Sequence, residues 1–279
     1  MDDFKGRTAV ITGGASGIGL AVATGLAAEG MNLVLADIEE GPLSNTVADI
    51  EANGTSVIGV RTDVSKRDDV LALAAAAKER FGNVHVLFNN AGVGGGGGVA
   101  DPDNLDMWEW VIGVDLFGVL YGIKAFASDM IAHGEPCHIV NTASMAGLLP
   151  FPGMGAYNVA KYSVVAMSEV LSLETAPTTN LGVSVLCPGF VATNIADSDR
   201  NMPENLVSRD EATAEQEMMQ GMIRELISQG MPPAEVAAQV VESIRTGRFY
   251  ILPHPEFHDR IEARTSSIIA GDAPIVSAL

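Results

Sequence analysis

The chain has 279 residues, of which 47% are hydrophobic and 18% charged, so it is long enough for one large α/β domain and need not form two. Its net charge of −19 repels phosphate backbones and anionic headgroups, which argues against nucleic acid and membrane surfaces as partners. No stretch is uniformly apolar over the ~18 residues that span a bilayer. The acidic start of the chain, from Met1 to Lys5, lacks the apolar core of a signal peptide, so we expect a cytoplasmic protein.

Short β-rich apolar runs alternate with helical patterns along most of the chain. The predicted strands lie at residues 8–11, 33–36, 56–60, 86–88, 138–140, 183–186 and 249–252. The first predicted helix begins near residue 17. The other predicted helices cover residues 43–52, 70–81, about 104–131, about 156–175 and about 233–245. Uniformly apolar strands that alternate with helices specify a parallel sheet covered on both faces. The sequence therefore predicts a single-domain, doubly wound α/β fold with about seven strands, which binds ligands at the carboxyl ends of its strands.

Two segments interrupt this alternation. Residues 192–231 are polar in places and rich in methionine, and residues 253–279 form a tail beyond the last predicted strand. The two cysteines are expected at the start of one strand (Cys137) and at the end of another (Cys187). A disulfide is not expected there, so we interpret both as small buried hydrophobic residues.

A glycine-rich turn follows the first predicted strand and reads Thr-Gly-Gly-Ala-Ser-Gly-Ile-Gly over residues 12–19. Glycines there let the backbone approach a pyrophosphate, and the next helix points its free N–H groups at the phosphates. Asp37 ends the second strand, where a carboxylate can accept the ribose hydroxyls of NAD and repel the 2′-phosphate of NADP. No Lys or Arg stands at position 16 or 38 to neutralise that phosphate. The other interpretation of Asp37 is a helix cap or a solvated turn residue, and we favour NAD.

Several further motifs occur in a fixed order, and together they resemble the short-chain dehydrogenases/reductases over about residues 5–252. Besides the glycine-rich turn they are Asp63-Val64, Asn-Asn-Ala-Gly at residues 89–92, Ser144, Tyr-Asn-Val-Ala-Lys at residues 157–161 and Pro-Gly-Phe-Val-Ala-Thr at residues 188–193. The resemblance implies a Rossmann fold and a nicotinamide-dependent enzyme that interconverts alcohols and ketones.

The residues expected to do the chemistry are Tyr157, Lys161 and Ser144. Tyr157 and Lys161 are four residues apart and so share one helix face. A free phenol has a pKa of ~10, and a neighbouring ammonium lowers it toward the range of a useful base. Ser144 follows the fifth strand, where its hydroxyl can hold the substrate oxygen. A core tyrosine, a surface lysine and a strand-end serine are the alternatives, and finding all three residues together opposes them.

The resemblance also assigns cofactor contacts. It implies that Lys161 holds the nicotinamide ribose, and that Tyr157 lies beside it. It places the remaining contacts at the phosphates (Gly13, Ser16, Gly17, Ile18, Gly19), the adenine (Asp63, Val64), the ribose turn (Asn89, Asn90, Ala91, Gly92) and the nicotinamide carboxamide (Pro188, Gly189, Val191, Thr193).

One position departs from the family pattern. The family usually has an asparagine in the middle of the long fourth helix, where it supports a proton-relay water beside the lysine, and this chain has Asp115. A carboxylate can accept hydrogen bonds but cannot donate as an amide does, and its charge would act on Lys161. We expect a working relay with a shifted pH optimum, and the alternative is an impaired relay.

The substrate is expected to be a secondary alcohol or ketone with a hydrophobic ring, aryl or steroid-like. In this family the segment after the Pro-Gly motif forms a lid, here residues 192–231, and methionines adapt to apolar ligands. A helix that packs its apolar face on the core explains these methionines equally well. Three residues near the catalytic group also indicate an apolar pocket. The methionines of the lid are Met202, Met218, Met219, Met222 and Met231. The three residues near the catalytic group are Phe151, Met145 and Met154.

Three further expectations concern the tail, the assembly and the competing functions. His254 and His258 do not form a zinc motif, because the glutamate is misplaced and Pro255 disrupts a helix there, so no metal is expected. The tail covers either a neighbouring subunit or part of the pocket.

Family members commonly pair the long helices at about 104–131 and 156–175, so we expect a homodimer or homotetramer. An NADP-preferring carbonyl reductase and a cofactor-binding sensor with weak turnover are the alternative functions.

Overall fold

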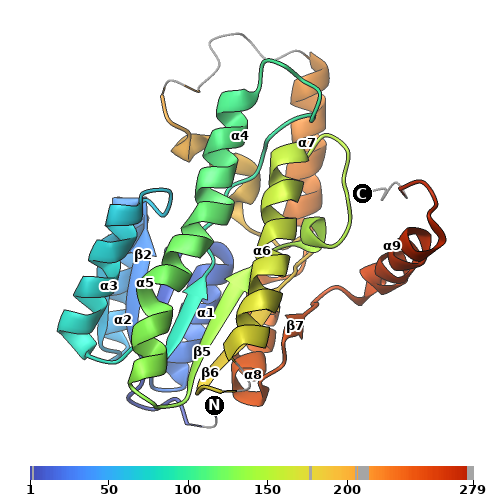
Figure 1. Ribbon diagram of the computed structural model, residues 1–279. Helices are drawn as coiled ribbons and strands as arrows, with labels where there is room; N and C mark the ends of the chain where they lie inside the picture. Colours follow the sequence, from blue (N-terminus) through green and yellow to red (C-terminus); the bar gives the residue numbers. More distant parts are fainter. Residues whose placement is uncertain (2, 176–177, 205, 207–213, 275–279) are drawn as a thin grey trace.

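The computed structural model describes residues 1, 3–175, 178–204, 206 and 214–274. Seven parallel strands form one sheet in the order β3-β2-β1-β4-β5-β6-β7, with helices on both faces (Figure 1). The strands are β1 (Thr8–Thr12), β2 (Asn32–Asp37), β3 (Val57–Arg61), β4 (Val86–Asn89), β5 (Cys137–Thr142), β6 (Leu181–Leu186) and β7 (Tyr250–Ile251). The predicted doubly wound sheet is confirmed, and its strand order reverses between β1 and β4.

Two layers of helices cover the sheet. One face carries α1 (Gly17–Ala28), α2 (Glu40–Ala52) and α8 (Pro233–Thr246). The other face carries α3 (Arg67–Phe81), α4 (Leu105–Ile112), α5 (Gly118–Ala132) and α6 (Gly155–Thr175). Side chains of successive strand residues enter opposite layers, so Leu33 and Leu35 pack with the α1 layer while Val34 and Ala36 pack with the α3 layer. This burial on both faces explains why the strands are uniformly apolar in sequence.

The long helical stretch Leu105–Ala132 corrects one expectation. Its mean hydropathy reaches 1.5, so by length and composition it could span a membrane, although no such stretch was expected. In the fold it packs between α3 and α6, and it carries a fully buried carboxylate at Asp115. We therefore interpret it as a core helix, and the cytoplasmic location stays a prediction.

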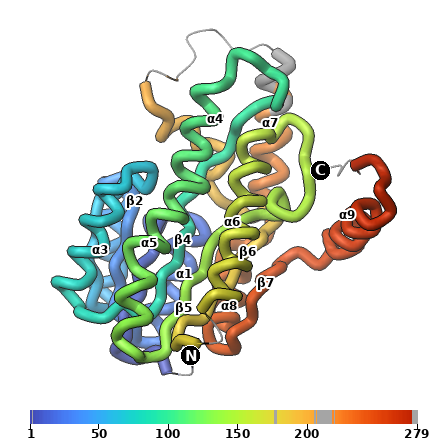
Figure 2. Tube along the Cα trace, in the orientation of Figure 1, coloured from blue at the N-terminus to red at the C-terminus, as the bar shows by residue number. Residues whose placement is uncertain are grey.

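The two interrupting segments contain short helices. Residues 192–231 include η3 (Asn194–Asn201) and α7 (Ala214–Ser228), and the tail contains η4 (Pro255–Phe257) and α9 (His258–Ala270). The expectation that Pro255 breaks a helix holds only locally, because α9 starts three residues later, beyond the turn η4. The helix α9 has no buried residue and projects from the body of the molecule (Figures 1 and 2).

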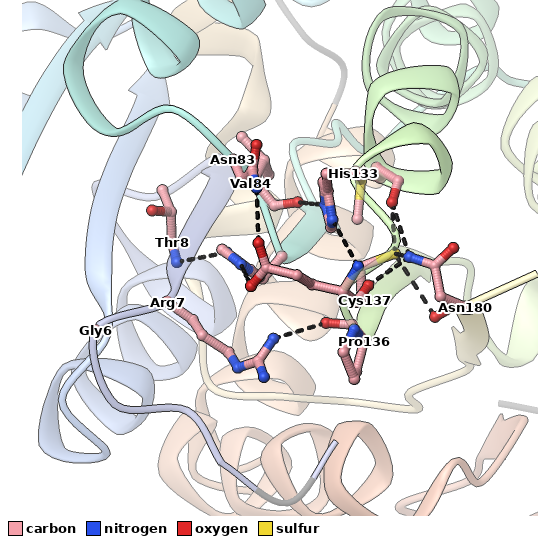
Figure 3. Close-up of polar contacts among 12 residues, drawn as sticks. Gly6, Arg7, Thr8, Asn83, Val84, His133, Pro136, Cys137 and Asn180 are labelled. Atoms are coloured by element: carbon pink, nitrogen blue, oxygen red, sulfur yellow. Dashed lines mark hydrogen bonds and ion pairs between the residues drawn. The ribbon is translucent and has the colours of Figure 1, made fainter.

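A polar network fastens the starts of the strands at the edge opposite their carboxyl ends (Figure 3). Arg7, before β1, donates to the carbonyl of Pro136, before β5, over 3.0 Å. The ring of His133, after α5, donates from Nε2 to the carbonyl of Val84, before β4, over 3.0 Å. These bonds satisfy main-chain groups where the sheet ladder begins, and they hold the strands in register.

Both cysteines are buried and unpaired, as small hydrophobic residues would be. Cys137 starts β5 and Cys187 directly follows β6, as expected. Burial raises the pKa of each thiol to about 12, so neither is a reactive thiolate near neutral pH.

Candidate active site

A cavity of about 1110 Å³ opens at the carboxyl ends of the strands. The segments that follow β1, β2, β3, β4, β5 and β6 all contribute residues to its wall. The strand order reverses between β1 and β4, so the chain segments that follow these two strands lead to helices on opposite faces of the sheet. A crevice therefore forms between them at the carboxyl ends of the strands.

The glycine-rich turn after β1 has the geometry of a phosphate cradle. Gly13 has φ of +63° and Gly17 has φ of +53°, a backbone conformation that glycine adopts without strain. A Cβ at Gly13 would lie 2.9 Å from the Cα of Ala91, and a Cβ at Gly19 would overlap the carbonyl oxygen of Gly13. Ser16 stands at the N-cap position of α1 without a side-chain capping bond, so the first N–H groups of α1 have no helical partner. The turn therefore leaves room for an anion at the cavity wall, and it fits a nucleotide pyrophosphate.

Asp37 lies at the end of β2 and lines the cavity. Its Oδ2 accepts the N–H of Ala15 and its Oδ1 accepts the N–H of Glu39, each over 3.1 Å. Burial raises the pKa of Asp37, against the lowering effect of these two N–H groups. The carboxylate is thereby held in place beside the glycine turn, where the ribose of an adenosine would lie.

The turn after β4 is tied to β1. Thr12 Oγ1 accepts the N–H groups of Asn90 and Ala91, over 2.9 and 3.1 Å. Asn90 Nδ2 donates to the carbonyl of Thr12 over 3.1 Å. Asn89 points away from the cavity and donates to Asn141 Oδ1 over 2.8 Å inside the sheet. The turn is therefore rigid, and Asn89 has a structural contact.

Ser144, Tyr157 and Lys161 converge in the cavity wall. Lys161 Nζ lies 5.4 Å from the centre of the Tyr157 ring and donates to the carbonyl of Thr142 over 3.3 Å. Ser144 follows β5 as the N-cap of η2 (Met145–Gly147), and its Oγ donates to the carbonyl of Pro188 over 3.4 Å. The three side chains come from a strand end and from one face of α6, as the spacing predicted.

Asp115 lies behind this wall, in a single π-helical turn (Gly113–Phe117) between α4 and α5. Its side chain is 0% exposed and does not line the cavity. Oδ1 accepts the N–H of Val93 over 2.8 Å, and Oδ2 lies 3.3 Å from Lys161 Nζ. The carboxylate and the ammonium thus form a buried ion pair at the back of the site.

The charges of the site act against one another on Tyr157. Burial raises the pKa of Tyr157, the Lys161 ammonium lowers it, and the Asp115 carboxylate raises it again. Burial lowers the pKa of Lys161, but the combined attraction of Asp115 and Tyr157 outweighs it, so the pKa of Lys161 is raised and the ammonium is retained. Burial raises the pKa of Asp115 against the attraction of Lys161. Lys161 therefore lowers the phenol pKa as expected, but burial and Asp115 together outweigh it, and the pKa of Tyr157 is raised.

Most of the predicted site residues lie in one wall. Three predicted residues do not line the cavity: Gly19, which packs on the glycine turn, Asn89, which bonds to Asn141 inside the sheet, and Asp115, which supports Lys161 from behind. Those that do line it are Gly13, Ser16, Gly17, Ile18, Asp37, Asp63, Val64, Asn90, Ala91, Gly92, Ser144, Tyr157, Lys161, Pro188, Gly189, Val191 and Thr193.

Sequence reasoning missed the α4 part of the wall, whereas the tail does cover part of the pocket, which was one of its two expected positions. Met107 and Trp110 of α4 and Phe257 of the tail also line the cavity. The sequence gives no signal that Met107 and Trp110 line the cavity, because α4 contains none of the motifs. Pro255 beside His254 was a usable signal for Phe257, because a proline-rich turn after the last strand can return the chain to the sheet edge.

The lid methionines meet the cavity less than expected. Met202 lines it, whereas Met231 packs on the α1 layer, and Met218 and Met222 are exposed. The side chain of Met219 lies outside the described residues. Met145, Met154 and Phe151 do line the cavity. Further apolar side chains of its wall come from α4 and from residues 192–231, at Ile195, Ile223 and Ile227 among others.

Comparison with known proteins agrees with this geometry. Residues 7–204 match the family described as short chain dehydrogenase. The chain belongs to the short-chain dehydrogenase/reductase family. A crystal structure of a short-chain dehydrogenase/reductase from Burkholderia phymatum in complex with NAD is 43% identical, covers 100% of both chains and superposes with a TM-score of 0.94.

Two curated relatives extend the comparison. A CLA biosynthesis dehydrogenase/reductase of Lactiplantibacillus plantarum is 33% identical over 99% of this chain and 98% of its own. A 3beta-hydroxysteroid dehydrogenase 2 of Eggerthella lenta is 34% identical over 72% of this chain and 77% of its own. The protein is thus an oxidoreductase of this family, and its cavity is suited to a nicotinamide nucleotide.

Proposed function

We propose that the protein transfers a hydride between NAD(H) and a secondary alcohol or ketone that carries a bulky hydrophobic ring. The observation that carries this proposal is the convergence of Ser144, Tyr157 and Lys161 on a cavity that apolar side chains also line. Bound NAD⁺ would supply the hydride acceptor, held by the glycine turn, Asp37 and residues 188–193.

The chain's own residues would move the proton. During alcohol oxidation the phenolate oxygen of Tyr157 takes the hydroxyl proton while the carbon-bound hydrogen leaves as a hydride. The Ser144 hydroxyl orients the substrate oxygen, and its hydrogen bond lowers the pKa of Tyr157. The Lys161 ammonium stabilises the phenolate from beside the ring. In the reverse direction Tyr157 returns the proton to the ketone oxygen.

The proposed preference for NAD rests on Asp37. A carboxylate held by two main-chain N–H groups cannot turn away from a ribose, and it would repel a 2′-phosphate. Glu39, two residues after Asp37, adds a second carboxylate, and Arg200 forms an ion pair with it over 2.7 Å. The bound NAD of the Burkholderia phymatum structure supports the same choice. An NADP-preferring carbonyl reductase is the alternative.

The proposed substrate class rests on the apolar wall. Aromatic and thioether side chains line the same cavity as the catalytic group, and such side chains bind rings through apolar contact. The steroid named for the Eggerthella lenta relative supports a bulky ring. The residues of this wall are Met107, Trp110, Met145, Phe151, Met154 and Phe257.

We also propose a homo-oligomer that pairs through the α5 and α6 helices, with residues 192–231 as a lid of a single-domain subunit. Apolar side chains are exposed along these helices, at Phe117 beside α5 and at Val159, Val170 and Leu173 on α6. Exposed apolar surface of this kind marks contact sites. Size-exclusion chromatography with light scattering measures the molar mass in solution. A mass equal to that of a single subunit would contradict the proposed oligomer.

The substrate proposal is tested by comparing kcat/KM for steroid, aryl and sugar secondary alcohols with NAD⁺ and with NADP⁺. We expect the ring alcohols to exceed the sugar alcohols by about a hundredfold, because their apolar area enters the wall described above. Turnover of the polar alcohols alone would overturn the proposal, and a preference for NADP⁺ would overturn its cofactor.

A further inference from the structure

The segment after β7 returns to the active site and touches the nicotinamide loop, residues 188–191, from behind. Its histidine, His254, is 5% exposed and does not line the cavity. Three residues further on, η4 places Phe257 in the cavity wall. The prolines on both sides of His254, Pro253 and Pro255, restrict its backbone, which has φ of −114° and ψ of 86°.

Both ring nitrogens of His254 bond to the main chain of this loop. Nδ1 accepts the N–H of Gly189 over 3.0 Å, and Nε2 lies 3.0 Å from the carbonyl oxygen of Phe190. Since a carbonyl only accepts, Nε2 carries the proton and Nδ1 is bare. The neutral ring therefore satisfies one donor and one acceptor of a loop that has already left the sheet.

The pairing of this loop with the sheet ends before Gly189. On its other side the N–H of Met231 donates to the carbonyl of Phe190 over 2.9 Å, and the N–H of Ala192 donates to the carbonyl of Met231 over 3.0 Å. The last main-chain bond between the β6 segment and β7 joins the N–H of Cys187 to the carbonyl of Ile251 over 2.9 Å. Beyond it the imidazole of His254 accepts the N–H of Gly189 and shares the carbonyl of Phe190 with the N–H of Met231. A Cβ at Gly189 would lie 3.0 Å from the His254 ring and 2.9 Å from Phe257, so glycine lets both rings reach the loop.

The loop connects directly to the catalytic group. The carbonyl of Pro188 accepts the N–H of Met145 over 2.8 Å and the hydroxyl of Ser144 over 3.4 Å. A shift of Gly189 would thus move both the wall at Pro188 and the orientation of the Ser144 hydroxyl. His254 acts on the site through the backbone and touches no reacting atom itself.

We propose that His254 is a positioning residue for the nicotinamide end of the cofactor, acting through its two hydrogen bonds to Gly189 and Phe190. The inference rests on the proposed NAD-dependent function. It predicts that loss of the imidazole weakens binding of the nicotinamide half and spares binding of the adenosine half, because Asp37 and the glycine turn lie outside its contacts.

The test compares Kd for NAD⁺ with Kd for ADP-ribose, which lacks the nicotinamide ring. We expect His254→Phe to raise Kd for NAD⁺ by about tenfold while Kd for ADP-ribose changes less than about twofold. His254→Asn keeps an oxygen near the position of Nδ1 and should recover part of the loss. The same substitution at the exposed ring four residues later, His258→Phe, is the matched control and should change neither value.

Each outcome decides the inference. Equal weakening of both ligands would show general damage to the fold, and unchanged binding of both would show that the imidazole is not needed. Either result overturns the positioning role while leaving the proposed function intact. A wild-type protein that binds neither ligand would overturn the proposed function itself. If His254→Phe does not fold, His254→Asn carries the same comparison, with an intermediate rise for NAD⁺ alone expected.

Discussion

The Asp115 carboxylate lies 3.3 Å from the Lys161 ammonium, and both side chains are buried. The π-helical turn Gly113–Phe117 aims this carboxylate at the back of the active site, where the N–H of Val93 fixes its other oxygen. An asparagine there would offer a neutral amide. With the carboxylate, the positive charge that should stabilise a Tyr157 phenolate is partly cancelled.

Replacing this carboxylate should change the pH dependence of catalysis. In Asp115→Asn the Lys161 charge is no longer opposed, so the pKa of Tyr157 falls. Oxidation requires the phenolate, and the acidic limb of the kcat/KM profile for alcohol oxidation therefore moves to lower pH. The measurement is kcat/KM from about pH 6 to about pH 10 in both proteins.

An exposed ion pair provides the matched control. Asp129 and Lys78 lie 2.7 Å apart on the surface, where solvent screens their charges. Asp129→Asn should leave the pH profile unchanged. A profile in Asp115→Asn that coincides with the wild type would contradict the electrostatic role of Asp115.

Asp37 should control the choice between NAD and NADP. In Asp37→Asn the charge that repels a 2′-phosphate is removed while the side chain keeps its size, so the ratio of Kd for NADP⁺ to Kd for NAD⁺ should fall by about tenfold. Fluorescence titration of both cofactors measures this ratio. The exposed carboxylate of α2 in Asp49→Asn is the control for the same change of charge. An unaltered ratio in Asp37→Asn would speak against the ribose contact.

The apolar wall should determine affinity for the substrate. Trp110 lines the cavity, whereas Leu105 on the same helix is 65% exposed and does not. Trp110→Ala should raise KM for ring alcohols by about tenfold or more and change kcat less, because it removes apolar contact made before the reaction. Leu105→Ala should have no effect. If KM for ring alcohols stays constant in Trp110→Ala, the substrate lies elsewhere.

Much of the fold and of the candidate site could be predicted from local patterns. The strands were placed to within a few residues, because burial on both faces leaves continuous apolar runs between glycine and proline turns. The convergence of Tyr157, Lys161 and Ser144 was predictable as well, since four-residue spacing on a helix and the end of a parallel strand each fix a direction.

The remaining features depend on contacts between distant parts of the chain. The bonds of His254 to Gly189 and Phe190 join residues 65 and 64 positions apart, and no local pattern encodes them. The π-helical turn that aims Asp115 is a one-residue irregularity in a helix whose apolar pattern continues through it. The helix α9 was missed because it has no buried face to leave an apolar periodicity.

A buried histidine of β5 should make the fold sensitive to acid. Burial lowers the pKa of His138 from 6.5 to about 3, and its Nε2 donates to Ser184 Oγ over 2.8 Å. Below pH 6.5 the unfolded chain binds a proton that the folded chain does not, so stability is complete above 6.5 and falls as the pH drops toward 3. At about pH 5 the loss should be about 2 kcal/mol.

Urea unfolding of the wild type and of His138→Gln at several pH values measures this contribution. The difference in the free energy of unfolding between the two proteins should shrink as the pH falls, because glutamine does not titrate. His258→Gln, at an exposed position, should follow the wild type. A difference that stays constant with pH would show that His138 does not contribute to acid sensitivity.

The central claim, hydride transfer with Tyr157 as acid and base, is tested most directly by following NADH formation from NAD⁺ and a ring alcohol in the wild type and in Tyr157→Phe. The phenyl ring keeps the packing of α6 and removes only the hydroxyl, so Kd for NAD⁺ should be unchanged while kcat falls by about a thousandfold. Equal kcat in the two proteins, or a wild type that binds NAD⁺ and forms no NADH with any alcohol tested, would contradict the claim and favour a cofactor-binding sensor.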